Sequence, residues 1–153
     1  MNLDFYVENI ISTDLFINKL KIYFEKFKID YLVFKDIYDS SQEEYDIVYQ
    51  IDSYKTKQMF STTIAIFIHN DKIASAFNKF DFFTNLALLL NADILVSTNI
   101  SPYDYLIFNK GICYYLVEED GTNEDYGFIL YPKMEITKDK AFDILYLPLS
   151  VPS

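Results

Sequence analysis

Residues 12–29, STDLFINKLKIYFEKFKI, repeat apolar side chains at the spacing of one helix face. The members of this stripe are Leu15, Phe16, Leu20, Tyr23, Phe24 and Phe27. Ser12 or Thr13 can cap the helix, and Asp14 then lies in its first turn. Because a helix with one apolar stripe must bury that stripe, the segment predicts an amphipathic helix packed on another element.

Several short runs have strand character. They are residues 3–11, 30–37, 44–51, 61–68 and 93–97. In the first run Leu3, Phe5 and Val7 share one face. The run STTIAIFI is β-branched and nearly continuous, which predicts a central strand buried on both faces.

A second helix is predicted between Asn70 and Asn91. Asn70 or Asp71 can cap its start, and Asn91 suits the position just past its end. Apolar side chains recur at helical spacing between these residues, namely Ile73, Phe77, Phe80, Ala87 and Leu90. We expect one continuous helix here.

The last third predicts an antiparallel meander. Its expected parts are strands at 104–108 and 112–119, a loop at 118–127, a strand at 128–132 and an edge strand at 142–149. Gly111 can take the positive φ that the turn NKG needs. The predicted fold is α+β: two amphipathic helices packed on one mixed, largely antiparallel β-sheet. Residues 1–153 are expected to form a single globular domain, with about 147–153 as an extended tail.

Composition excludes several function classes. The net charge is -10 and Arg is absent, so direct binding to nucleic acid or to an anionic membrane is disfavoured. The single cysteine, Cys113, allows neither an internal disulfide nor a cysteine-based zinc site. No apolar run reaches the length of a membrane span, and the N-terminus lacks the basic region of a signal peptide, which favours a cytoplasmic location.

The stretch 114–128, YYLVEEDGTNEDYGF, holds five carboxylates and no lysine. Its carboxylates are Glu118, Glu119, Asp120, Glu124 and Asp125. A solvated hairpin loop, a metal site and a docking surface are three interpretations of it. The spacing does not match a calcium-binding loop, so no metal is predicted. Tyrosine pairs well with cationic surfaces, so Tyr114 and Tyr126 are candidate anchors for a partner beside these carboxylates.

Catalytic equipment is sparse. His69 follows a predicted strand and could act as a general base with Asp71 or Asp81, although a capping or surface histidine is the preferred interpretation. Residues 97–105 could bind a small ligand, but Asn99 and the Ser-Pro step also explain them as turns. No nucleophile elbow or glycine-rich phosphate loop is present, so we predict a non-catalytic protein without a cofactor.

Residues 82–111, FFTNLALLLNADILVSTNISPYDYLIFNKG, pass from a helical pattern to a buried strand, a polar loop and a hairpin. This order resembles small bacterial immunity proteins of polymorphic toxin systems, such as those of contact-dependent inhibition. The resemblance covers about a fifth of the chain and is a pattern of residue types. It implies a cytosolic protein that binds and neutralises one toxin domain, and it assigns no binding residues.

Three functions remain as hypotheses. An acidic, aromatic-rich inhibitor would be drawn to a basic, nuclease-like toxin, with either the acidic segment or a sheet edge around Tyr45, Asp46 and Tyr49 as its binding surface. A phage-type mimic of nucleic acid would instead space carboxylates like phosphates along one face. A small enzyme would hold His69 beside a carboxylate in a pocket. Exposed tyrosines could equally form a homodimer interface.

Overall fold

The computed structural model describes residues 1–9, 11–39, 44–53, 60–101, 104–123 and 127–146, with backbone alone for 119–123 and 127–133. The strands within these residues are β1 (Asn2–Val7), β2 (Phe34–Asp36), β3 (Ile47–Ser53), β4 (Thr62–Ile68), β5 (Asp93–Ser97), β6 (Asp104–Asn109), β7 (Cys113–Asn123) and β8 (Gly127–Ile136). The helices are α1 (Thr13–Phe24), the 3₁₀ turn η1 (Glu25–Phe27), α2 (Asp71–Ala76), α3 (Lys79–Leu90) and α4 (Lys138–Leu145).

All eight described strands form one sheet in the order β2-β3-β4-β1-β5-β6-β7-β8. Only β2 and β3 pair in parallel; every other described pair is antiparallel. The prediction of an α+β fold with one mixed, largely antiparallel sheet is therefore confirmed. The first strand of the chain lies in the middle of this sheet, between β4 and β5. β3 is hydrogen-bonded to β2 along one edge and to β4 along the other. The prediction of a free sheet edge around Tyr45, Asp46 and Tyr49 is therefore wrong.

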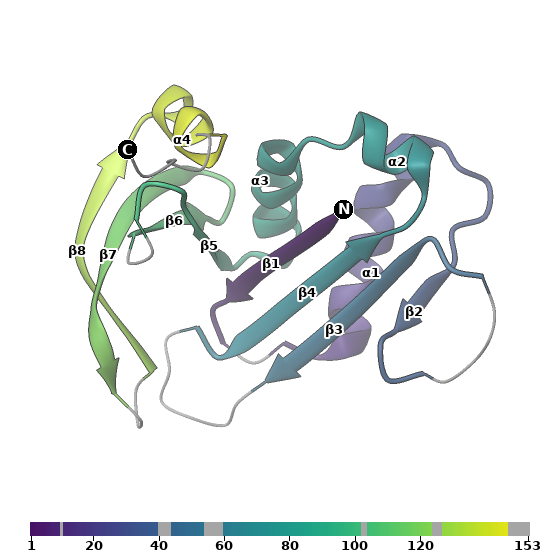
Figure 1. The fold of residues 1–153 in the computed structure, drawn as a ribbon, viewed down its shortest axis with the longest axis horizontal. Helices are drawn as coiled ribbons and strands as arrows, with labels where there is room; N and C mark the ends of the chain where they lie inside the picture. Colours follow the sequence, from purple (N-terminus) through teal and green to yellow (C-terminus); the bar gives the residue numbers. More distant parts are fainter. Residues whose placement is uncertain (10, 40–43, 54–59, 102–103, 124–126, 147–153) are drawn as a thin grey trace, which may run out of the picture.

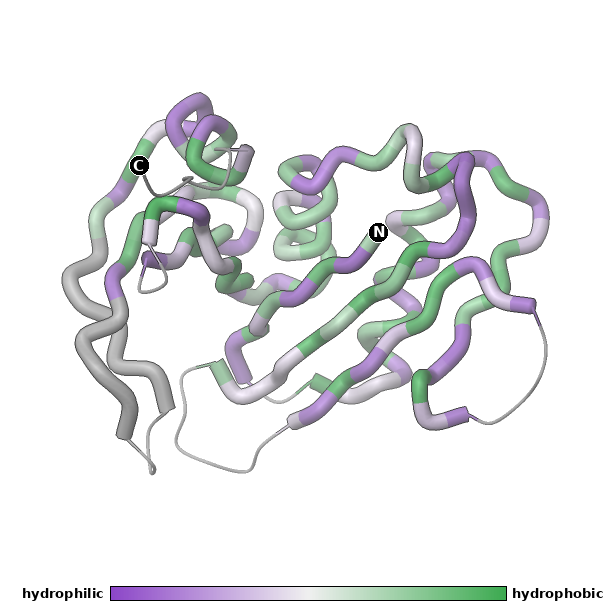
Figure 2. The backbone as a smooth tube through the Cα atoms, in the orientation of Figure 1, coloured by the Kyte–Doolittle hydropathy of each residue, from purple (hydrophilic) through white to green (hydrophobic). Residues whose placement is uncertain are grey.

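One face of the sheet carries the helices. Figure 1 looks onto the opposite face of β1, β3 and β4, with α1 behind these strands. Leu3, Phe5 and Val7 point towards the helices and are buried there, as the alternation predicted. Edge-to-face contacts join this layer, for example between Phe5 and Phe83, whose ring centroids lie 5.3 Å apart. In Figure 2, β4 is almost continuously hydrophobic, whereas green and purple stretches are mixed along β3.

The first helix begins and ends close to where its sequence predicts. The Ser12 side chain caps α1 by accepting a hydrogen bond from the Leu15 amide at 3.2 Å. Phe16, Leu20 and Phe24 are fully buried. Leu15, predicted on the same stripe, is 46% exposed, so its assignment to the buried stripe is wrong.

The predicted second helix is two helices. Asn70 caps α2 through a bond from the Ile73 amide at 3.1 Å. Asn78 caps α3 in the same way through the Asp81 amide, also at 3.1 Å. Phe77 and Asn78 both have extended backbone angles, because a residue that serves as a cap cannot also continue the preceding helix. Asn91 ends α3 at φ 49°, as predicted.

The C-terminal third departs most from expectation. β7 runs through Asn123, so most of the predicted loop 118–127 is strand, and β8 continues past Pro132. β8 is the last strand of the sheet, where proline is tolerated because edge strands leave some amides unpaired. Within the predicted strand 142–149, residues through Leu145 belong to α4, which is capped by Thr137, and Tyr146 ends it. Residues 147–153, which include the predicted extended tail, lie outside the described residues.

Candidate partner-binding surface

The acidic segment lies on the β7–β8 hairpin. Glu118 is exposed on β7, opposite Asp104 of β6. Glu119 and Asp120 belong to the same strand, at a register irregularity, and only their backbone is described. Glu124, Asp125 and Tyr126 lie outside the described residues. The predicted acidic docking surface is therefore placed only at Glu118.

Tyr114 cannot be the exposed anchor that the sequence suggested. It is 8% exposed and belongs to the main core beneath the helices. Its ring lies 5.3 Å from that of Phe80 on α3 and 5.8 Å from that of Phe108 on β6. The prediction failed because Tyr114 and Tyr115 are neighbours on one strand, and alternate residues of a strand face opposite sides of the sheet.

The face of the sheet opposite the helices is the best candidate for a binding surface. On its central strands it presents Asn2, Asp4 and Tyr6 of β1, Gln50 and Asp52 of β3, Thr63, Ala65 and Phe67 of β4, and Asp93 and Ser97 of β5. We call these residues the open face. Sequence reasoning missed it, although the alternation of polar residues along β1 and β3 could have indicated it.

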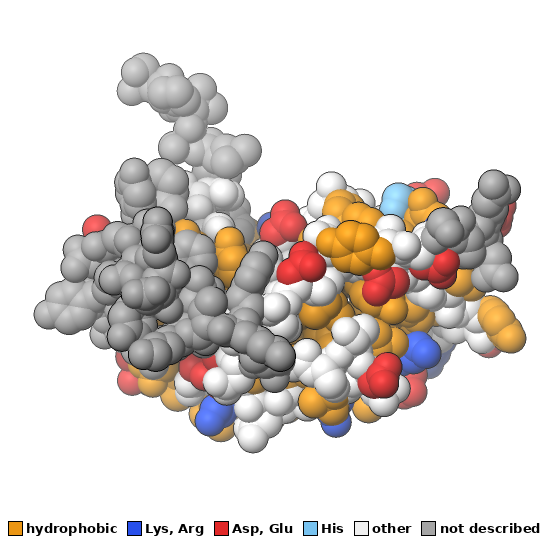
Figure 3. Space-filling view, turned by 90° about the horizontal axis from the view of Figure 1, so that it is seen from below, with side chains coloured by type: hydrophobic (Ala, Val, Ile, Leu, Met, Phe, Trp, Pro, Cys, Tyr) orange, Lys and Arg blue, Asp and Glu red, His pale blue; other side chains and the backbone are white. Residues whose placement is uncertain are grey.

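The open face is acidic. Its charged side chains are Asp4, Asp52 and Asp93. The register also places Lys35 of the edge strand β2 on this side of the sheet, next to Val48. Most described lysines lie on the helices or at their ends: Lys19, Lys21, Lys26, Lys28, Lys72, Lys79, Lys138 and Lys140. In Figure 3, seen from below Figure 1, red carboxylates and orange apolar side chains intermingle over the described surface, and most of the visible blue lysines lie in its lower half. A cationic surface would therefore meet its complement on the sheet side.

Part of the sheet is closed on this side. Leu95, Ile107 and Val117 form a second buried cluster with Phe60 and Tyr105, and Tyr6 packs against it. The accessible area is thus centred on β1, β3 and β4. There Asp4 is exposed, and its carboxylate makes no hydrogen bond or ion pair with any described residue. Asp52 and Asp93 instead accept bonds from Gln50 and Asn109 at 2.9 and 2.7 Å.

His69 lies at a cavity of about 910 Å³ at the end of β4. The cavity is lined by Ile29, Tyr31, Val33, Glu44, Tyr45, Asp46, His69, Asn70, Asp71 and Lys72. The His69 ring meets Tyr45 edge-to-face at 5.0 Å and is exposed. The Asp46 carboxylate has a structural role, because its two oxygens accept hydrogen bonds from the Val33 amide and the Asn70 side chain. Within the described part of the chain, no carboxylate is hydrogen-bonded to the His69 imidazole.

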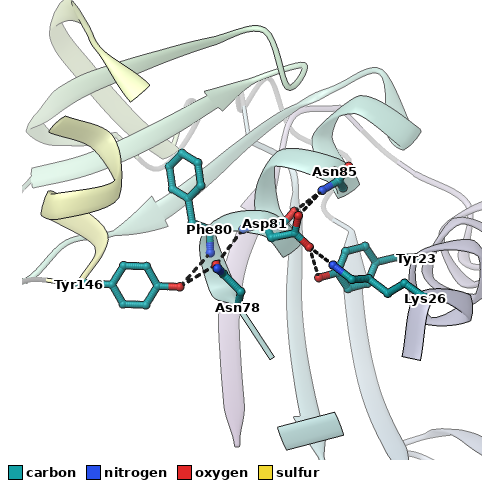
Figure 4. Close-up of polar contacts among 7 residues, drawn as sticks. All are labelled: Tyr23, Lys26, Asn78, Phe80, Asp81, Asn85 and Tyr146. Atoms are coloured by element: carbon teal, nitrogen blue, oxygen red, sulfur yellow. Dashed lines mark hydrogen bonds and ion pairs between the residues drawn. The ribbon is translucent and has the colours of Figure 1, made fainter. Parts of the chain in front are cut away.

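Asp81, considered as a general base beside His69, does not line the His69 cavity. Its carboxylate instead joins α3 to the region of α1 (Figure 4). Its carboxylate accepts a hydrogen bond from the Tyr23 hydroxyl at 2.9 Å and pairs with Lys26. The Asn85 side chain donates to its other oxygen at 2.9 Å. Burial alone would raise the pKa of Asp81, but the bonds from Lys26 and Tyr23 outweigh it and lower the pKa. Burial, helped by the bond to Asp81, raises the pKa of Tyr23.

The polar run 97–105 is explained by turn chemistry among the residues described there. The Thr98 hydroxyl donates to the Asp104 carbonyl at 3.1 Å, and the Asp104 amide donates to the Ser101 carbonyl at 3.2 Å. The Ile100 amide donates to the same Thr98 hydroxyl at 3.3 Å. These bonds use the polar groups locally, as the turn interpretation predicted.

Other kinds of site are not formed by the residues that the structure describes. No cluster of histidine, cysteine and carboxylate side chains among them could hold a metal ion. None of the described helices has the length and apolar character that crossing a bilayer requires. The chain matches no family model, no curated protein and no solved structure.

Proposed function

We propose that this chain is a non-catalytic protein inhibitor of the immunity type, which binds and neutralises one basic toxin domain. The observation that supports it best is the open face, where a broad sheet surface is left uncovered by helices and carries carboxylates beside Tyr6 and Phe67. Aromatic and acidic side chains on one surface suit a partner with exposed lysine and arginine.

The charge of the whole chain supports the same proposal. A net charge of -10 attracts a basic protein over distances beyond contact and accelerates its association. Rapid capture matters for an inhibitor, because a toxin acts until it is bound. The same charge repels nucleic acid, which fits an inhibitor that competes with a nucleic-acid substrate for a cationic cleft.

The test begins with affinity capture from lysate of the source cells at low and high salt, followed by identification of the retained proteins. Each retained basic protein is then expressed in a bacterial host with and without this chain. The proposal expects one partner that stops growth alone and permits growth when the chain is co-expressed. If no retained protein is toxic, or if co-expression leaves its toxicity unchanged, the proposal is wrong.

A further inference from the structure

β1 pairs with β4 along its whole length, but it pairs with β5 only at its C-terminal end. Met1 and Ile68 exchange two backbone hydrogen bonds, at 3.1 and 2.8 Å. In an antiparallel pair such doubly bonded residues alternate with residues whose backbone groups point the other way. The backbone groups of Leu3, Phe5 and Val7 therefore point to β4, and those of Asn2 and Asp4 point towards β5.

β5 does not reach Asn2 and Asp4. It pairs with β1 at Tyr6 and Val7, and the Glu8 amide donates to the Asp93 carbonyl at 3.1 Å. Continuing this register would place Ser97 opposite Asp4, but Ser97 is the last residue of β5, is exposed, and pairs with β6 instead. Among the described residues, the amides and carbonyls of Asn2 and Asp4 on this side consequently have no strand partner.

The free backbone and the free carboxylate lie on the same residue. Asp4 is exposed on the open face, and its side chain has no bonded partner among the described residues. A second copy of this chain is disfavoured as occupant, since pairing two such segments would bring like charges together and the chain carries -10 overall. A segment bearing lysine or arginine would instead meet an opposite charge.

We infer that Asn2–Asp4 of β1 accepts an extended, lysine- or arginine-bearing segment of the partner by strand addition. The segment's backbone pairs with the free amides and carbonyls, and its cationic side chain meets the Asp4 carboxylate. This inference rests on the proposed function for the partner's basic character. It moves the main contact from the predicted acidic segment at Glu118 to the middle of the sheet.

Amide hydrogen exchange measured by NMR tests the inference directly. In the free protein, the Leu3 and Phe5 amides exchange slowly because they bond to β4, and the Asp4 amide exchanges fast. The probe is the peptide Ac-Lys-Val-Lys-Val-Lys-NH₂ at low salt, with Ac-Glu-Val-Glu-Val-Glu-NH₂ as its matched control. At about nine-tenths occupancy by the lysine peptide, the Asp4 amide should exchange about tenfold more slowly, because only unbound molecules exchange there.

Two variants separate the backbone from the charge. Asn2→Pro removes an amide that the β4 pairing does not use, and Asp4→Asn removes the charge while keeping the backbone. Each should weaken binding of the lysine peptide about fivefold, while Asp143→Asn on α4 removes an equal charge without effect. The thermal unfolding of all three variants is measured alongside, so that a fold defect is recognised.

Three results would overturn the inference: an Asp4 amide as slow as Leu3 in the free protein, exchange unchanged by the lysine peptide, or equal effects of both peptides. None of these concerns toxicity, so the growth experiment can still support the inhibitor function with a different contact surface. Conversely, the lysine peptide could slow exchange of the Asp4 amide while the growth experiment finds no toxic partner. That result would support a binding site for basic peptides and refute the immunity role.

Discussion

Replacing Asp81 by alanine should destabilise the contact between the two main helices. Tyr23 is 5% exposed and its hydroxyl donates to Asp81. Without the carboxylate, this hydroxyl loses its acceptor inside the packed layer. Lys26 loses its ion-pair partner, and Asn85 keeps only its bond to the Asp81 carbonyl at 2.8 Å.

The expected cost follows from the burial of each group. An unsatisfied buried hydroxyl costs roughly 1–3 kcal/mol. The Lys26 pair contributes at most about 1 kcal/mol, because its side chains are 48% and 35% exposed. A carboxylate in the first turn of α3 adds about 0.5 kcal/mol through the helix dipole. We therefore expect Asp81→Ala to lower the free energy of unfolding by about 3 kcal/mol, and the melting temperature by roughly 6–12 °C for a chain of this size.

Urea and thermal unfolding of four proteins measure this cost: wild type, Asp81→Ala, Tyr23→Phe and the double variant. Tyr23→Phe removes the donor and should cost about 1 kcal/mol alone. In the Asp81→Ala background it should instead recover part of the loss, because it removes the hydroxyl that was left without an acceptor. Additive costs, or an Asp81→Ala loss below about 0.5 kcal/mol, would refute a bond between Tyr23 and Asp81 as the main link.

Other consequences can be measured on the same protein. Gly111→Ala should lower the free energy of unfolding in urea by about 2–4 kcal/mol. Gly111 has φ +74°, and a Cβ there would lie 2.8 Å from the Thr84 carbonyl oxygen and 2.9 Å from the Leu88 Cβ. A cost below about 1 kcal/mol would contradict this close approach. Because the pKa of Asp81 is lowered by folding, its stabilisation is present above the unfolded pKa near 4 and disappears as pH falls through the folded value. The stability gap between wild type and Asp81→Asn should accordingly close in acid, and a gap unchanged down to pH about 2 would be inconsistent with that shift. Because the pKa of Tyr23 is raised, stability should decline as pH rises above about 10, and Tyr23→Phe should show a shallower decline; identical profiles would count against the raised pKa.

Local signals predicted the helices well where one interpretation was clear. Ser12 and Asn91 act at the ends where their side chains predicted them to act. The break at Asn78 was missed because apolar residues continue at helical spacing across it, and spacing alone does not distinguish one helix from two with a cap between them. α4 was mistaken for a strand for a related reason: a short segment with buried Ile144 and Leu145 fits either period.

The candidate surface depended on information that a single sequence does not contain. The position of β1 in the middle of the sheet follows from long-range pairing with β4 and β5, which no local pattern encodes. The free backbone at Asp4 depends further on where β5 ends its pairing. Sequence reasoning instead selected the densest run of carboxylates, at Glu118–Asp125, because charge density is visible along a chain and shared sheet faces are not.

The central claim is that a basic partner docks on the open face, and calorimetric titration of the toxic partner from the growth experiment tests it most directly. Asp4→Lys reverses the charge in the middle of this face, and Asp143→Lys makes the same change on α4. We predict that Asp4→Lys weakens binding at low salt at least about tenfold and reduces the salt dependence of the affinity, while Asp143→Lys changes neither appreciably. Equal losses for both variants, or full affinity for Asp4→Lys, would contradict docking on this face.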